Sequence, residues 1–298
     1  MHPRGGEERR MTVCLRQAVF VPPAVSVVAD ELGLFADSGL EVETVLIESS
    51  SDQRDRLVGG DVDVGVTAVD NLVVWNRGGG ELRVVAQVES TTPLRLVARS
   101  SIEKVQDLRG ARLGVDALDN GFAVVLRRLL AQRGLESADC EWVPVGGVRE
   151  RFEALREGTV DATLLGPPLD ELAIRERLVE LISVVEEVPD FPGQGVVAGA
   201  AALHDGERLS RYLGALEAAR RWLSGAPREQ ALEVLARGGY GTGAARAALR
   251  TCPVSLVPVR AGLERIVSMR RELGMLPDPA PRVEDLYDSG PLGLELGR

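Results

Sequence analysis

The sequence predicts an α/β protein of two similar lobes, because one motif occurs twice and because strand-like and helix-like segments alternate along the chain. The motif Leu-x-x-Gly-x-Val-Asp, followed by small or apolar residues, occupies residues 57–63 and again residues 155–161. Each copy follows a helix-like run closed by Gly-Leu, at Gly39 and at Gly134. The two copies are too far apart for a solenoid repeat, so they indicate two related lobes with a cleft between them.

The first half reads as alternating strands and helices. Pro23 opens a helix after the first strand, and its apolar positions recur at helical spacing as far as Leu34. The serines before Asp52 can cap a second helix. The expected strands are residues 12–21, 41–47, 62–66, 82–88 and 94–99.

The second half repeats this order. Strands are expected at residues 113–115, 141–145, 163–165, 181–185 and 196–202, with helices at 121–132 and 148–156. Four helices then follow between residues 210 and 273. This order predicts mostly parallel sheets and a hinge with two crossovers between the lobes. We expect a disordered tail at residues 1–10, one lobe from residues 11–95 and 196–298, and the other from residues 96–195.

The composition excludes several functions. The net charge of −10 argues against nucleic acid as a partner, because phosphate binding needs clustered positive charge. Lys104 is the only lysine and lies in a surface-like run, so Schiff-base catalysis is not indicated. Cys14, Cys140 and Cys252 are widely spaced and predict buried thiols. We expect neither a metal site nor a cofactor.

The N-terminal region resembles a secretion signal only superficially. Pro22 and Pro23 interrupt the apolar run from Ala18 to Ala29, and charged residues flank it. No other segment is long and apolar enough to predict a membrane span. The sequence therefore predicts a cytoplasmic protein without stable membrane insertion.

The order of several short motifs resembles a known family. These are Ala29-Asp-Glu-Leu-Gly33-Leu-Phe35, the two Leu-x-x-Gly-x-Val-Asp copies, Val105-x-Asp-Leu-Arg-Gly110-Ala-Arg-Leu-Gly114-Val, and Val283-Glu-Asp-Leu-Tyr-Asp288. Together they resemble the solute-binding proteins for nitrate, sulfonate and pyrimidine precursors, a branch of the type II periplasmic-binding-protein fold. The resemblance implies that the ligand lies at the hinge cleft and that an ABC permease is the partner of an exported form.

The same family resemblance extends to cytoplasmic enzymes. Aromatic sulfinate desulfinases have a nucleophilic cysteine after the first strand, and the corresponding position here is near Phe20. Pyrimidine synthases need a cysteine-rich iron motif and a reactive histidine, whereas this chain has only His2 and His204. The chain departs from both patterns, and we expect His204 to lie on the surface.

Ligands of open α/β sheets bind at the carboxyl ends of the strands, where helix N-termini offer free N–H groups. That rule selects residues of the first half that either contact a ligand or cap a helix: Glu48, Ser50, Thr67, Asp70 and Asn71. In the second half it selects Asp116, Asn120, Gly121, Phe122, Gly146, Gly166 and Pro167, where tight turns are the alternative for the glycines.

Four further candidates lie beside the expected hinge or the first strand. Thr92 and Gln194 are near the two crossovers, and Phe20 could pack on a ring, although core packing is the alternative. Arg95 lies in an apolar strand, so it either pairs with a carboxylate or contacts an anionic ligand.

Three functions remain open at this point. The chain binds a small anionic or heteroaromatic molecule as a solute-binding-type protein, it is a decarboxylase, lyase or desulfinase-like enzyme on that scaffold, or it senses a ligand for a partner protein. No Ser/His/Asp or Cys/His set decides between them.

Overall fold

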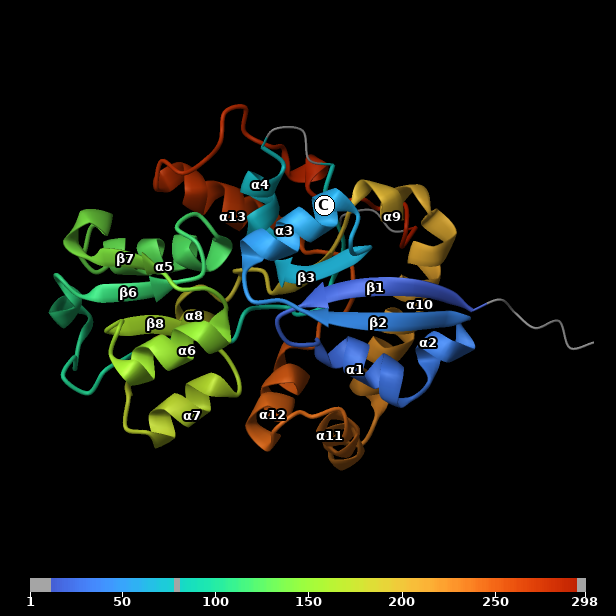
Figure 1. Cartoon of the computed structure of the whole chain (residues 1–298), viewed down its shortest axis with the longest axis horizontal. Coiled ribbons are helices and arrows are strands. Elements are labelled where there is room, and N and C mark those ends of the chain that lie inside the picture. Colours follow the sequence, from blue (N-terminus) through green and yellow to red (C-terminus); the bar gives the residue numbers. More distant parts are fainter. Residues whose placement is uncertain (1–11, 78–80, 294–298) are drawn as a thin grey trace, which may run out of the picture.

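The described chain forms two five-stranded sheets that lie side by side in Figure 1. The structure is a computed structural model that describes residues 12–77 and 81–293. The expected tail at residues 1–10 lies outside the described residues. Two sheets with helices around them confirm the predicted two-lobed α/β fold. The first lobe contains the sheet with the N-terminal strand, and the second lobe contains the other sheet.

The sheet of the first lobe has the strand order β2-β1-β3-β10-β4. Strand β1 pairs in parallel with β2 and β3, whereas β10 is antiparallel to β3 and β4. The strands are β1 (Val13–Val19), β2 (Leu40–Leu46), β3 (Val64–Ala68), β4 (Arg83–Gln87) and β10 (Gln194–Ala198).

The sheet of the second lobe repeats this arrangement with the order β7-β6-β8-β5-β9. Here β5 is antiparallel to β8 and β9. Strands β5 and β10 each enter a sheet along a crossover from the other lobe, so no helix returns them to a parallel direction. The strands are β5 (Arg95–Ala98), β6 (Arg112–Val115), β7 (Glu141–Pro144), β8 (Ala162–Leu165) and β9 (Val179–Ser183).

The helices cover the sheets. In the first lobe they are α1 (Ala24–Glu31), α2 (Leu34–Asp37), α3 (Ser50–Gly59), the 3₁₀ turn η1 (Val69–Asn71) and α4 (Leu72–Trp75). In the second lobe they are α5 (Gly121–Ala131), α6 (Val148–Glu157), α7 (Leu169–Arg175) and α8 (Val184–Glu187). Shorter 3₁₀ turns are η2 (Val105–Leu108), η3 (Ser137–Asp139) and η4 (Val283–Asp285).

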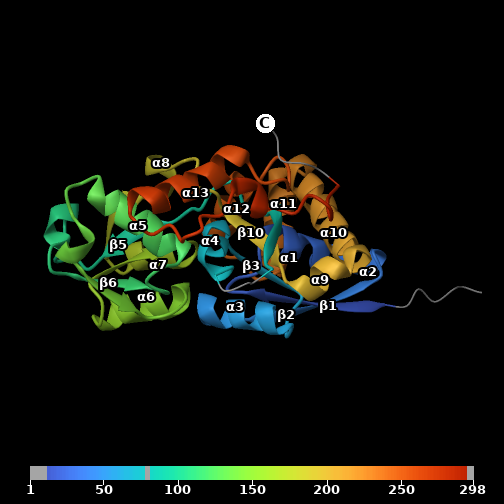
Figure 2. The same cartoon turned by 90° about the horizontal axis from the view of Figure 1, so that it is seen from above.

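Five helices follow β10 in the described chain, and one of them, α13, contacts both lobes. They are α9 (Ala200–His204), α10 (Gly206–Gly225), α11 (Arg228–Arg237), α12 (Thr242–Thr251) and α13 (Arg260–Glu272). Helices α10, α11 and α12 pack against α1, whereas α13 packs against both η1 and α5. Figure 2 shows α13 reaching across to α5, on the side of the molecule opposite α3. Helix α13 therefore contacts both lobes.

The repeated motif ends a helix and starts a strand in each lobe. Gly60 follows α3 with φ 76°, and Gly158 follows α6 with φ 74°. This left-handed conformation strains any residue with a Cβ atom, which explains the glycine of the motif.

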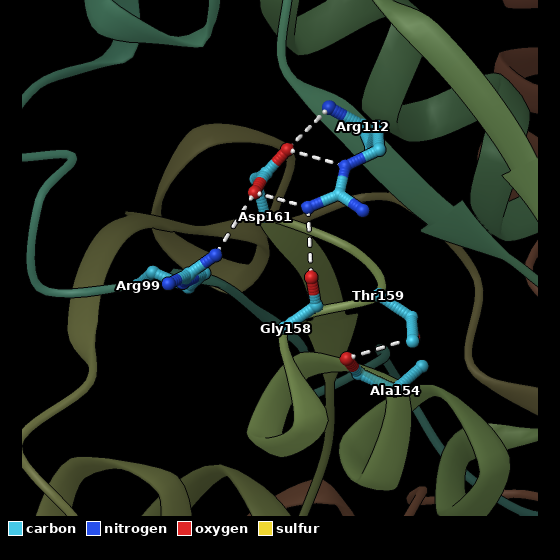
Figure 3. A network of polar contacts seen from close by, with 6 residues as sticks. All are labelled: Arg99, Arg112, Ala154, Gly158, Thr159 and Asp161. Carbon is cyan, nitrogen blue, oxygen red and sulfur yellow. Dashed lines mark hydrogen bonds and ion pairs between the residues drawn. The ribbon is translucent and has the colours of Figure 1, made fainter.

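The aspartate of the motif holds two parallel strands in register. In the first lobe the carboxylate of Asp63 accepts the backbone N–H of Arg16 at 2.7 Å. In the second lobe the carboxylate of Asp161 accepts hydrogen bonds from the backbone N–H and from Nε of Arg112, at 2.9 and 3.0 Å (Figure 3). It also contacts the guanidinium of Arg99. The repeat is therefore a structural device, and its aspartates bind the neighbouring strand.

Two further observations concern expected features. His204 lies at the end of α9 and is exposed, in agreement with the predicted surface position. Within residues 12–77 and 81–293, no helix is both long and apolar enough to cross a bilayer.

Candidate functional site

The strand ends of both lobes face one cavity of about 180 Å³. One water molecule needs roughly 10–15 Å³ by this measure, so the cavity accommodates a small organic molecule. The first lobe contributes residues that follow β1 and β3, and the second lobe contributes residues that follow β6 and β8 together with the start of α6. Both crossovers and α12 complete the wall. We call this space the interlobe cavity.

Many of the residues selected from the sequence line the interlobe cavity. They are Phe20, Thr67, Asn71, Thr92, Asp116, Asn120, Phe122, Gly166, Pro167 and Gln194. Phe20, Asp116 and Gly166 directly follow strands, and most of the others lie within a few residues of a strand end, so the strand-end rule explains their meeting. The other selected residues lie outside the lining, and each has a protein partner.

Two of the selected residues outside the lining, Glu48 and Ser50, join the lobes beside the cavity. The carbonyl of Glu48 accepts the N–H of Gly147 at 2.7 Å. The N–H of Ser50 donates to both oxygens of Asp116 at 3.2 Å. A Cβ atom at Gly147 would lie 3.0 Å from the Glu48 carbonyl oxygen, so this close approach of the two lobes favours glycine.

A second contact between the lobes lies deeper. The N–H of Gly121 donates to the side chain of Asn71 at 2.8 Å. Asp70 is fully buried and pairs with Arg270 of α13, whose Nε lies 2.8 Å from the carboxylate. Arg270 also donates to the carbonyl of Asp119 in the second lobe at 2.8 Å. Asp70 therefore holds α13 between the lobes, and Arg270 compensates the charge of its carboxylate.

The remaining two have local partners. The guanidinium of Arg95 lies 3.3 Å from the carboxylate of Asp170 and 3.0 Å from that of Glu180. Of the two expected alternatives, Arg95 therefore pairs with carboxylates. Gly146 has a φ of 115°, and its carbonyl accepts a bond from Arg151 at 2.9 Å. Both residues act within the second lobe.

Arg151 is a lining residue that the sequence reasoning missed. It is 4% exposed and lies on α6, where two guanidinium nitrogens donate to the carbonyls of Gly146 and Leu164. Burial lowers the pKa of Arg151 to about 10, so it stays cationic at neutral pH. It shares a helix face with the apolar Val148, Phe152 and Leu155, and that placement is the signal that could have identified it.

Glu89 is the second missed residue. It follows β4 at the start of the first crossover and lines the interlobe cavity. Its oxygens accept from the backbone N–H and the side chain of Gln194, at the long distances of 3.4 and 3.5 Å. Burial raises the pKa of Glu89 to about 7. A carboxylate directly after a buried apolar strand was the available sequence signal.

Much of the wall is apolar. Phe20, Phe122 and Tyr240 are half-buried and line the cavity with prolines and with alanines of α12. The Tyr240 hydroxyl donates to the carbonyl of Pro22 at 2.7 Å, and burial raises the pKa of this phenol. Trp75, in contrast, is buried in the core. Such a wall with a few polar groups is typical of sites for small molecules.

The nucleophilic cysteine that the resemblance implies for desulfinases has no counterpart among the residues that line this cavity. Phe20 lines it near the position where the resemblance expects the desulfinase nucleophile. The three cysteines, all within the described ranges, lie outside the lining. Desulfinase-like attack by a thiol therefore has no group to perform it here.

Comparison with known families and sequences agrees with the fold. A model of the family described as "NMT1/THI5 like" matches residues 24–230, which is more than half of the chain. A protein of Brucella abortus that is named as a binding protein is 24% identical over 219 residues, covering 72% of this chain and 67% of its own.

Solved structures show the same architecture. The alkanesulfonate-binding protein of Xanthomonas axonopodis pv. citri, bound to MOPS, superposes with a TM-score of 0.74 at 18% identity and covers 91% of this chain and 96% of its own. A desulfurization enzyme superposes with a TM-score of 0.67 at 16% identity and covers 94% and 97% of the two chains. Identities this low establish a shared fold, and this fold includes a binding protein and an enzyme.

Proposed function

Because the chain belongs to the NMT1/THI5-like family, we propose that it binds a small anionic molecule between its lobes, as a solute-binding-type protein. The observation that carries this proposal is Arg151, a buried cation in the cavity wall. Among the described residues its hydrogen bonds go to carbonyls, and the carboxylates of Asp116 and Glu150 form no ion pair with it, although their charges raise its pKa.

A guanidinium has five N–H groups, and two nitrogens of Arg151 are bonded to carbonyls. A buried charge without an ion pair is costly, and an anionic ligand in direct contact with the guanidinium would reduce that cost. Helix α6 begins three residues before Arg151, and its first N–H groups also favour negative charge.

The contacts beside the cavity support closure of the lobes around the ligand. Ser50 and Asp116, and likewise Glu48 and Gly147, connect the lobes through polar atoms that water could satisfy equally well when the lobes separate. The partner of such a protein in import would be an ABC permease, and that role is part of the proposal.

The test compares two arginines of α6. Thermal unfolding is followed with alkanesulfonates, arylsulfonates and carboxylates, for the wild type, for Arg151→Gln and for Arg149→Gln. Arg149 is exposed on the same helix, so its replacement changes the net charge equally. A ligand at a hundredfold excess over its Kd stabilises the wild type by about 2.7 kcal/mol.

We expect Arg149→Gln to keep this shift and Arg151→Gln to lose it. Equal shifts in both variants would contradict the assignment of Arg151. Native mass spectrometry of the purified protein provides the second measurement, because a co-purified anion would identify the ligand class directly. Conversion of the bound molecule during incubation would show an enzyme in place of a binder.

A further inference from the structure

The wall of the interlobe cavity contains two groups of opposite charge, Arg151 and Glu89, and within the described residues neither forms an ion pair. Arg151 is the cation described above. Glu89 is the acid, and among the described residues no basic side chain lies within ion-pair distance of it. Because the fold supplies an ion pair for neither group, we expect the ligand to carry charges that compensate both of them.

Glu89 lies where the two crossovers between the lobes meet. A Cβ atom at Gly193 would lie 2.4 Å from the Cβ and from the carbonyl oxygen of Glu89, so the second crossover packs directly on this residue. The neighbouring donors both come from Gln194, and the Tyr240 hydroxyl is already bonded to Pro22. The carboxylate is thus held in place and only weakly compensated.

Asp116, the other acid of the wall, differs from Glu89. Its oxygens accept the N–H of Ser50 and the side-chain amide of Asn120 at 3.0 Å. Asp116 therefore holds the lobes together, and its charge also acts on Arg151. Glu89 remains as the acid that is available to a ligand.

The physical cost of this arrangement is clear. A carboxylate removed from water without a cation takes up a proton more readily, as the raised pKa of Glu89 reflects. A ligand group with a positive charge and N–H donors would satisfy it at neutral pH. Arg151 requires the opposite charge, and the aromatic wall residues lie in the same cavity.

We propose that the ligand is dipolar, with an acidic group bound by Arg151 and a protonated nitrogen bound by Glu89. Its apolar part packs on Phe20, Phe122 and Tyr240. This inference rests on the proposed function, because it adds a second charge requirement to the same cavity.

The experiment uses matched probes that differ by one charged group. Taurine is compared with ethanesulfonate and ethylamine, and para-aminomethylbenzoate with para-toluate and benzylamine, by titration calorimetry. The two series have different spans between the charges. The proteins are the wild type, Glu89→Gln, Glu89→Asp and the control Glu103→Gln, whose side chain is exposed and outside the cavity.

We expect a dipolar probe to bind at least about tenfold more tightly than both of its singly charged analogues, as one charge-assisted hydrogen bond provides. Glu89→Gln is expected to weaken the dipolar probe to the level of the acid alone and to leave the acid unchanged. Glu103→Gln is expected to bind like the wild type. Glu89→Asp keeps the charge, so a retained preference there supports the role even if Glu89→Gln folds poorly.

Two results would overturn the inference. If the acids without nitrogen bind as tightly as the dipolar probes, or if Glu89→Gln keeps the full preference, Glu89 does not select the ligand, and the proposed anion binding stands. If no acid of either series binds and the purified protein carries no anion, the proposed function fails, and this inference fails with it.

Discussion

The unpaired state of Glu89 predicts how the stability of the ligand-free protein depends on pH. Its pKa is raised from 4.5 to about 7 by burial. The folded state therefore binds this proton more tightly than the unfolded state does. Stability from this group is fully present below pH 4.5 and is lost as the pH rises through about 7.

The size of the effect follows from the two pKa values. A difference between 4.5 and about 7, at about 1.4 kcal/mol for each pH unit, gives about 3.5 kcal/mol over the whole titration. Glu89→Gln removes the titration, because an amide stays neutral across this range. Relative to the wild type, the variant is expected to become more stable by about 2.5 kcal/mol between pH 5 and pH 8, because part of the full difference develops below pH 5.

The assay is urea denaturation of both proteins at several pH values between 5 and 8, followed by circular dichroism. The difference between the two free energies of unfolding is the quantity of interest, because the other titrating groups are common to both proteins and cancel. Parallel pH profiles would refute the reasoning, since they would mean that Glu89 is ionised in water and in the fold with equal ease. A difference that grows toward low pH would have the wrong sign.

Three further changes test the packing between and within the lobes. Asp161→Asn is expected to destabilise the protein by about 1–3 kcal/mol in urea denaturation, because it weakens charge-assisted hydrogen bonds to the neighbouring strand. Since the pKa of Asp161 is lowered in the folded state, this loss of stability should shrink below pH 3.8. Gly121→Ala would place a Cβ atom 2.7 Å from the Cβ of Asp70, so we expect a loss of about 1–3 kcal/mol in the same assay. The matched change Gly214→Ala, in the open interior of α10, should instead stabilise by about 0.5–1 kcal/mol. Arg270→Met leaves the carboxylate of Asp70 buried without its cation and is expected to lower the free energy of unfolding by about 3–5 kcal/mol. The double variant with Asp70→Asn should recover part of this loss. Equal losses in the single and double variants would contradict the pairing.

The sequence predicted the scaffold well, because local patterns encode it. The repeated motif, helical spacing and strand alternation depend on residues within about ten positions of one another. The glycine at the end of each copy needs a left-handed backbone, which is a local property. The antiparallel direction of β5 and β10 was less accessible, because it depends on where the chain crosses between the lobes.

The strand-end rule also placed several side chains of the cavity wall. Phe20, Asn71, Asp116 and Asn120 each follow a strand closely, and strand ends meet at one edge of a parallel sheet. Ser50 followed the same rule but holds the lobes together through Asp116, because its N–H faces the carboxylate of the other lobe. The rule therefore identifies the neighbourhood of the cavity, and it does not assign roles within it.

What the sequence determined by itself is the two-lobed scaffold with a cavity at the strand ends. Only the tertiary structure decided which charges in that scaffold are compensated. Arg95 lies in an apolar strand and Arg151 on a helix rich in charged residues, and neither pattern shows how the charge is compensated. In the structure Arg95 lies beside Asp170 and Glu180, whereas the guanidinium of Arg151 donates to carbonyls. The physical reason is that compensation of a buried charge depends on groups brought together from distant parts of the chain, and local patterns carry no information about those groups.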